Sequence, residues 1–253
     1  MARRSADIPA IMSSPVEHGA EFTDREEVLI REAYARRQKR GMDGVYSFFN
    51  PSYVLQVHER ENELLFMLSR QGIRSLEEKK ILEIGCGTGY WLRAFLQWGA
   101  LPGNVFGIDL LSERIEHARN LCPRGVRLDC GNASALAFPD ASFDLVLQST
   151  VFTSILDRAM RKRVAAEMLR VLKPGGFVLW YDFFVHNPRN SDVRGVRRTE
   201  ISKLFPGCQI HCRRTTLAPP IGRLVGGYSQ MMYRLLSRAK ILCTHYLCLI
   251  KKN

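Results

Sequence analysis

Apolar runs alternate with amphipathic stretches through the middle of the chain. Runs that are apolar throughout predict strands buried on both faces, as in a parallel sheet. We place these strands at residues 79–85, 104–110, 126–130, 143–150 and 177–184. Stretches with helical periodicity lie between them, at residues 89–99, 112–121 and 157–173. The alternation predicts an α/β fold in which helices cover both faces of a doubly wound sheet.

Helical patterns also precede this core. Residues 23–40 open acidic and close basic, which suits the helix dipole, and a second helix has Asn50 as cap, Pro51 at its first position and Gly72 at its end. We expect residues 1–22 to be disordered, 23–72 to form a helical cap or lid, and 73–253 to form the main domain. Residues 208–217 and 243–252 add two strands to make seven, mostly parallel, with a helical insertion near 219–240.

The stretch "ILEIGCGTGY" follows the first predicted strand with Gly85, Gly87 and Gly89. Glycines at a strand–helix turn let a ligand approach the backbone and permit positive φ. A nicotinamide dinucleotide would favour a small residue where Tyr90 stands, and Glu83 would repel its pyrophosphate. A ligand that carries a positive amino or sulfonium group fits this turn better.

A second carboxylate, Asp109, ends the second predicted strand. In that place it can accept hydrogen bonds from both hydroxyls of a ribose. Leu110 can cover one face of an adenine, and Asn132 and Ala133, after the third strand, can meet the adenine edge. Taken singly, either acid could face solvent, but two such acids around one glycine turn indicate a nucleoside site.

The segments "LEIGCGTG", "GIDLLSERIEHAR", "CGNASALAFPDASFDLVLQS" and "MLRVLKPGGFVLWYDF" together resemble class I S-adenosylmethionine-dependent methyltransferases of the small-molecule type. The resemblance spans roughly residues 80–183 and implies a Rossmann-like fold, with S-adenosylmethionine as methyl donor and S-adenosylhomocysteine as product. Asn132 departs from the Asp of many members. The implied donor contacts are Glu83, Gly85, Cys86, Gly87, Gly89, Asp109, Leu110, Asn132, Ala133 and Gln148. The segments "YDFFVHNPRN" and "THYLCLI" also resemble bacterial methyltransferases encoded among polysaccharide-assembly enzymes.

An oxygen acceptor would need a base. His186, after the fifth strand, is our candidate, with Asp182 to orient it; the alternatives are an exposed loop histidine and a plain strand-end acid. Arg189 and Arg194 either clamp an anionic acceptor or belong to a solvated loop. Four aromatic residues could close over the donor and acceptor or only pack, namely Tyr46, Phe48, Phe49 and Tyr53. The segment Gln148-Ser149-Thr150 lacks the Asn-Pro-Pro-Tyr pattern of amide and adenine-amino methyltransferases.

Charge and cysteine content bound the partners. The net charge is +12, and residues 194–253 hold twelve Lys or Arg against one acid. This basic stretch is either a solvated face or a surface for an anionic partner, and residues 219–240 could contact an anionic membrane, cap the fold or form a dimer contact. Seven scattered cysteines without a CxxC pair indicate reduced thiols, no metal site and a cytoplasmic protein of a bacterium. A peripheral place at the inner membrane surface is the alternative.

We therefore expect a methyltransferase that acts on a small molecule, at a hydroxyl oxygen of a sugar, glycan or lipid-linked intermediate. The alternatives are an RNA methyltransferase, for which the basic stretch lacks interleaved stacking aromatics, and a non-catalytic partner subunit that binds the donor. Nucleic acid is the less favoured partner, and the sequence leaves the oligomeric state open.

Overall fold

The structure is a computed structural model that describes residues 20–39, 44, 46–186 and 190–253, without the side chains of 20–24 and 38. We expected residues 1–22 to be disordered, and residues 1–19 of that segment lie outside the described residues. Helix α1 (Ala20–Lys39) begins three residues before the predicted start at Thr23. Arg189 of the predicted arginine clamp also lies outside the described residues.

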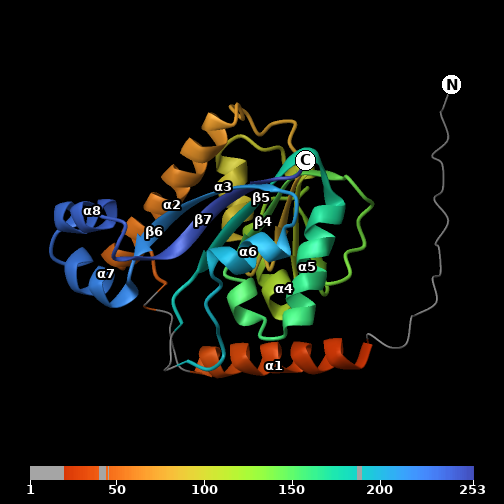
Figure 1. Ribbon diagram of the computed structural model, residues 1–253, viewed down its shortest axis with the longest axis horizontal. Helices are drawn as coiled ribbons and strands as arrows, with labels where there is room; N and C mark the ends of the chain where they lie inside the picture. Colours follow the sequence, from red (N-terminus) through yellow and green to blue (C-terminus); the bar gives the residue numbers. More distant parts are fainter. Residues whose placement is uncertain (1–19, 40–43, 45, 187–189) are drawn as a thin grey trace.

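Seven strands form one sheet in the order β3-β2-β1-β4-β5-β7-β6 (Figure 1). They are β1 (Ile81–Ile84), β2 (Val105–Asp109), β3 (Arg127–Cys130), β4 (Phe143–Ser149), β5 (Leu172–Phe183), β6 (Gln209–Leu217) and β7 (Cys243–Lys251). Strands β1 to β5 are parallel, and β7 runs antiparallel to both β5 and β6. The predicted doubly wound, seven-stranded sheet is confirmed, and its order reverses between β1 and β4, where ligands bind in such sheets.

Helices cover both faces of the sheet (Figure 1). One core joins β-strand side chains such as Ile84 to α5 and α6, and the other joins Ile81 to α2, α3 and α4. The helices after α1 are α2 (Pro51–Arg70), α3 (Tyr90–Gln97), α4 (Ser112–Leu121), α5 (Arg158–Val171), α6 (Arg198–Leu204), α7 (Pro219–Gly226) and α8 (Gln230–Arg238), with 3-10 turns η1 (Pro102–Asn104) and η2 (Phe152–Ser154). Neighbouring β1 side chains enter opposite cores because side chains alternate along a strand.

Three parts of the chain differ from, or refine, the expectations. The insertion between β6 and β7 consists of two helices, α7 and α8. Helix α6 was not predicted; its seven residues fall in what the sequence suggested was an arginine-rich loop. Helix α1 covers the edge of the sheet at which the parallel strands end, and there Ile30 joins the core that contains Ile84.

The expectation that all thiols remain reduced is wrong for one pair. Cys212 and Cys248 form a disulfide, with their Cα atoms 4.0 Å apart. They are direct partners in the antiparallel register of β6 and β7 although 36 residues separate them in sequence. Linear spacing does not reveal such a pair, because only the strand register brings the two residues together. The described cysteines 86, 122, 130, 208 and 243 are free.

Candidate functional site

A cavity opens at the carboxyl ends of β1, β2 and β4, beside the point where the strand order reverses. Five of the residues that the sequence indicated line it, namely Gly85, Asp109, Leu110, Asn132 and Ala133. Its further lining comes from Ser149, Thr150 and Val151 after β4, from Met160 and Val164 of α5, and from Ile30 and Tyr34 of α1. The cavity therefore lies where the predicted nucleoside site was expected.

The glycine turn after β1 forms one wall of this cavity. Gly85 has a φ of +65°, and a Cβ atom at this position would lie 2.5 Å from the Val151 side chain. Gly87 also has a positive φ, and its N–H donates to the Asp109 carboxylate at 2.8 Å. Any side chain at position 85 would collide with Val151. Glycine avoids this collision and leaves the backbone of the turn accessible to a ligand.

Asp109 is fixed in one orientation by backbone amides. Its Oδ2 accepts from Gly87 N, and its Oδ1 accepts from Leu111 N at 2.9 Å. The carboxylate is 7% exposed and lies on the cavity wall. Because each carboxylate oxygen can accept more than one hydrogen bond, lone pairs remain for two ligand hydroxyls.

Glu83 is buried behind the glycine turn. It is 2% exposed, and its Oε2 has no hydrogen-bond partner among the described residues. Burial, and next the charge of Asp109, raise the pKa of Glu83 well above its ordinary value, while Arg60 opposes the shift. A buried carboxylate oxygen without a partner fits a ligand that brings a positive charge.

Arg60 of α2 is a residue of the site that the sequence analysis missed. Its guanidinium carbon lies 5.1 Å from the ring centroids of Tyr90 and Trp91 and 5.5 Å from that of Tyr181. Its buried Nε has no hydrogen-bond partner within the described part of the chain. One sequence signal existed: Arg60 occupies the helical position between Val57 and Leu64, both fully buried, where an apolar residue would be expected.

Helix α1 closes the cavity on the side where an adenine would lie. Its Glu26 is 6% exposed and accepts at Oε1 from the amides of Leu156 and Asp157, at 2.6 and 3.0 Å. Its Glu27 accepts from Asn132 Nδ2, whose Oδ1 in turn accepts from Ser134 N at 2.8 Å. The amide at position 132 thus uses its donor to hold α1, which an aspartate could not do when ionised.

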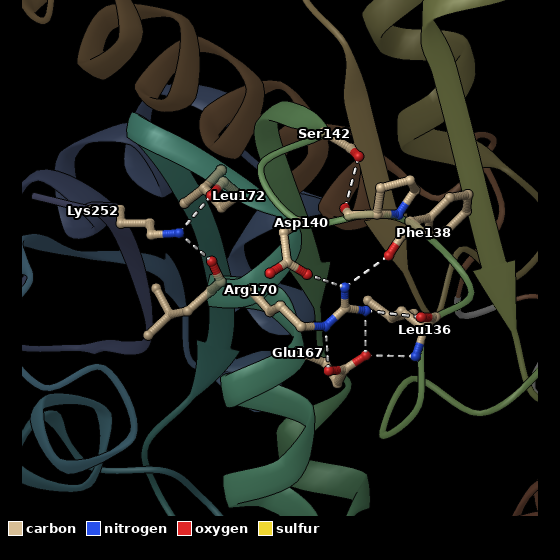
Figure 2. Close-up of polar contacts among 10 residues, drawn as sticks. Leu136, Phe138, Asp140, Ser142, Glu167, Arg170, Leu172 and Lys252 are labelled. Atoms are coloured by element: carbon tan, nitrogen blue, oxygen red, sulfur yellow. Dashed lines mark hydrogen bonds and ion pairs between the residues drawn. The ribbon is translucent and has the colours of Figure 1, made fainter. Parts of the chain in front are cut away.

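An arginine on α5 holds the loop that follows Ala133 (Figure 2). Arg170 pairs with Glu167 and Asp140 and donates to the carbonyl oxygens of Leu136 and Phe138, all at 2.7–2.8 Å. Glu167 also accepts from Leu136 N at 2.7 Å. This network fixes the path of the chain from the cavity wall to β4.

The aromatic residues expected to form a lid lie apart from the α1 side. Tyr46 and Phe48 pack edge-to-face on Tyr53, and Phe48 stacks on Tyr90 at the start of α3. Tyr46 is 61% and Phe49 is 99% exposed. Through Tyr90, which both Phe48 and Arg60 contact, the group lies next to the start of α3.

Asp182 and His186 follow β5 but are in different environments. Asp182 is fully buried, and its carboxylate accepts from Thr153 Oγ1 at 2.7 Å, from Thr153 N at 3.1 Å and from Phe183 N at 3.1 Å. Burial raises its pKa to about 7. His186 is exposed. The hydrogen bonds of Asp182 thus hold η2 against β5.

The remaining predicted residues support the loops around the cavity. Gln148 is fully buried. Its Oε1 accepts from Val151 N at 3.1 Å, and its Nε2 donates to the carbonyl oxygen of Tyr181 at 3.5 Å, so this side chain shapes the turn after β4. Cys86 is buried, and burial raises the pKa of its thiol. Gly89 has a φ of +76° as cap of α3. Arg194 is exposed, and its backbone N–H donates to the carbonyl oxygen of Thr153 at 2.8 Å.

Among the described residues, no group of three or more His, Cys, Asp or Glu side chains is placed to hold a metal ion. Within the same residues, no helix combines the length and the apolar character that crossing a membrane requires.

Comparison with known proteins agrees with this geometry. Residues 81–176 match the profile of a methyltransferase domain. A 2-methyl-6-phytyl-1,4-hydroquinone methyltransferase of Synechocystis sp. is 34% identical over 105 residues, which are 41% of this chain and 31% of that protein. A fatty-acid O-methyltransferase of Mycolicibacterium smegmatis is 36% identical over 118 residues, 42% of this chain and 38% of that protein. A tRNA N(3)-cytidine methyltransferase of Gallus gallus is 32% identical over 112 residues, 41% of this chain and 30% of that protein.

The chain thus spans about a third of the length of these relatives. Among solved structures, an S-adenosylmethionine-dependent methyltransferase from Mesorhizobium loti has a TM-score of 0.57 at 16% identity and covers 76% of this chain and 98% of its own. At that identity, the likeness shows the fold. The buried, partnerless oxygen of Glu83, the open turn at Gly85 and the fixed carboxylate of Asp109 suit S-adenosylmethionine. With the domain match over residues 81–176, they show that the chain contains a methyltransferase domain whose site suits S-adenosylmethionine.

Proposed function

We propose that the protein transfers a methyl group from S-adenosylmethionine to a hydroxyl oxygen of a small-molecule acceptor. The observation that carries the proposal is the pair of buried, partnerless atoms at Glu83 Oε2 and Arg60 Nε, close to the glycine turn. The donor ends in an amino acid, so its ammonium suits the carboxylate and its carboxylate suits the guanidinium. When bound, the donor supplies a methyl group already activated on a positive sulfur.

The remaining residues of the site would hold the donor in place. Asp109 would accept from the ribose hydroxyls, and Leu110 and Tyr34 would enclose the adenine between β2 and α1. Asn132 would meet the adenine edge while its amide holds Glu27. Alignment of donor and acceptor with exclusion of water is the main task for such a transfer, and it is worth about 7–11 kcal/mol.

Transfer to an oxygen also requires that the acceptor hydroxyl lose its proton. We propose His186 as the base, because it is exposed and lies directly after β5, on the edge of the sheet that carries the donor site. Asp182 would act through η2, since its carboxylate bonds Thr153. Arg194, together with Arg189, would attract an anionic acceptor.

The acceptor class that we favour is a sugar, glycan or lipid-linked intermediate. The relatives include enzymes named for a quinone, a fatty acid and a tRNA, so a small molecule and an RNA are both represented. The turn Gln148-Ser149-Thr150 after β4 lacks the Asn-Pro-Pro-Tyr pattern of amino-group methyltransferases, which favours an oxygen acceptor. The other alternative is a subunit that binds the donor but transfers no methyl group, and the experiment must distinguish it from an active methyltransferase.

The test is methyl transfer from labelled donor to separated pools of glycans, lipid extract and tRNA. We expect label in the glycan or lipid pool, and a loss of about 10²–10⁴-fold in kcat for His186→Ala at unchanged donor affinity. The matched control is His117→Ala on α4, which should retain full turnover. Label that enters only tRNA would contradict the acceptor class, and donor binding without transfer to any pool would favour the non-catalytic subunit.

A further inference from the structure

The two-helix insertion between β6 and β7 carries an apolar face that the described part of the chain leaves exposed. On α8, Met231 is 80% and Leu235 is 62% exposed, while Tyr233 and Ser237 are buried. Met231, Leu235 and Arg238 are spaced at i, i+4 and i+7, so they share the face opposite the buried residues. An amphipathic helix in a globular protein normally turns its apolar stripe inward, and α8 turns one outward.

The neighbouring part of the insertion extends this surface. Four further large apolar side chains are exposed there, namely Leu224, Tyr228, Met232 and Ile241. In Figure 1, α7 and α8 project at the left end of the molecule, whereas α1 runs along its lower side. We call these residues, together with Met231 and Leu235, the insertion surface.

Arginines frame the insertion surface, and acids are absent from it. Residues 219–242 contain Arg223, Arg234, Arg238 and Lys240 and no Asp or Glu. Lys240 pairs with Glu59 and Glu63 of α2. Arg223, Arg234 and Arg238 are exposed, and no acid pairs with them in the described part of the chain. The surface thus offers three free cations beside exposed methionine and leucine side chains.

The insertion is firmly seated on the body of the protein. Ser52 Oγ, at the start of α2, donates to the carbonyl oxygen of Gly222 in α7 at 2.5 Å. A Cβ at Gly226 would lie 2.3 Å from the same hydroxyl, so α7 packs directly on α2. Whatever binds the insertion surface therefore takes a fixed orientation relative to the rest of the protein.

We propose that the insertion surface docks on an anionic membrane surface. Apolar side chains flanked by arginines match the boundary between acyl chains and headgroups, and each arginine gains from anionic lipid. A second copy of the chain is disfavoured, because a twofold contact would bring Arg234 and Arg238 against the same arginines. Nucleic acid would satisfy the arginines but would leave Met231 and Leu235 in water.

The test is co-sedimentation with vesicles, without donor or acceptor. We expect binding to vesicles of phosphatidylglycerol mixed with phosphatidylcholine, weak binding to phosphatidylcholine alone, and a decrease with salt as the charges are screened. Met231→Asp with Leu235→Asp should lower the partition coefficient at least about tenfold, because two apolar side chains no longer enter the bilayer. Arg234→Gln alone should lower it about fivefold.

The matched controls are Leu101→Asp with Leu121→Asp, which change the charge equally at exposed leucines outside the insertion, and Arg124→Gln for the single arginine. These should bind like the wild type. Equal loss in the controls, or unchanged binding of the double aspartate variant, would overturn the proposal. So would a dimer in sedimentation velocity without lipid that the double variant abolishes, because the surface would then belong to a second copy.

Discussion

Glu83 and Arg60 each keep one buried atom that finds no hydrogen-bond partner in the described part of the chain, which is costly in a protein that binds nothing. The two side chains come from β1 and α2, and the charge of Arg60 offsets part of the rise in the pKa of Glu83. The positions of Glu83 and Asp109 could be predicted, because an apolar strand followed by a glycine turn fixes where the strand ends. Arg60 could not, because its approach depends on how α2 packs across the sheet.

Asp182 gives a prediction at the same scale. Its pKa is raised from 3.8 to about 7, so between these values the folded protein binds more protons than the unfolded chain. The free energy of unfolding therefore falls as pH rises through this window. Asp182→Asn removes this pH dependence. Thermal melts at pH 4 to 8 should therefore show the free energy of unfolding of the variant rising, relative to that of the wild type, by up to about 1.4 kcal/mol per pH unit. A constant difference across that range would contradict the assigned pKa.

At the scale of elements, α1 borders the donor site, whereas the α7–α8 insertion lies outside the cavity lining. The sequence predicted a helix at residues 23–40 and helices near 219–240, and both exist. It predicted a cap or lid over residues 23–72 but not the contacts that hold α1 over the cavity, since these are hydrogen bonds that Glu26 and Glu27 accept from residues more than a hundred positions away. Such pairs leave no periodic signal in the sequence.

Helix α1 should act as the cover of the donor. Glu26→Ala would remove the charged acceptor of the partly buried amides of Leu156 and Asp157, which costs about 1–3 kcal/mol and loosens α1. We expect donor affinity to fall about tenfold through faster dissociation, measured by stopped-flow fluorescence. Glu32→Ala is the control, because that carboxylate lies on the exposed side of the same helix and, among the residues that the structure describes, pairs with Arg36 alone. Equal dissociation rates in the two variants would rule out this role for α1.

At the scale of the whole molecule, a covalent cross-link joins the two strands at the antiparallel end of the sheet. The disulfide between Cys212 and Cys248 joins β6 to β7 around the α7–α8 insertion. The mostly parallel, seven-stranded sheet and both helical layers could be predicted from apolar runs and amphipathic spacing, but not the order of the strands. The disulfide could not, because the register of two strands 36 residues apart depends on the insertion between them.

Reduction of this disulfide should destabilise the whole domain. A cross-link that closes a loop of 36 residues is worth about 4 kcal/mol through the entropy of the unfolded chain. We expect Cys212→Ser to lower the melting temperature by several degrees and to make it insensitive to reductant, whereas the wild type should lose a similar amount when reductant is added. Cys208→Ser, at a free cysteine nearby in sequence, is the control. A wild-type melt unaffected by reductant would show that the disulfide does not contribute.

The central claim is that this site holds S-adenosylmethionine by both ends, through its nucleoside and its amino acid. Calorimetric titration with S-adenosylhomocysteine, 5′-methylthioadenosine and NAD tests both ends at once, because the second ligand lacks the amino acid. We predict that S-adenosylhomocysteine binds most tightly and NAD far more weakly. Asp109→Ala should weaken both adenosyl ligands at least about tenfold, at roughly 1.5–3 kcal/mol for a charge-assisted contact. Glu83→Gln should weaken S-adenosylhomocysteine alone. NAD binding as tight as that of S-adenosylhomocysteine, or a Glu83→Gln variant that binds all three ligands like the wild type, would contradict the account.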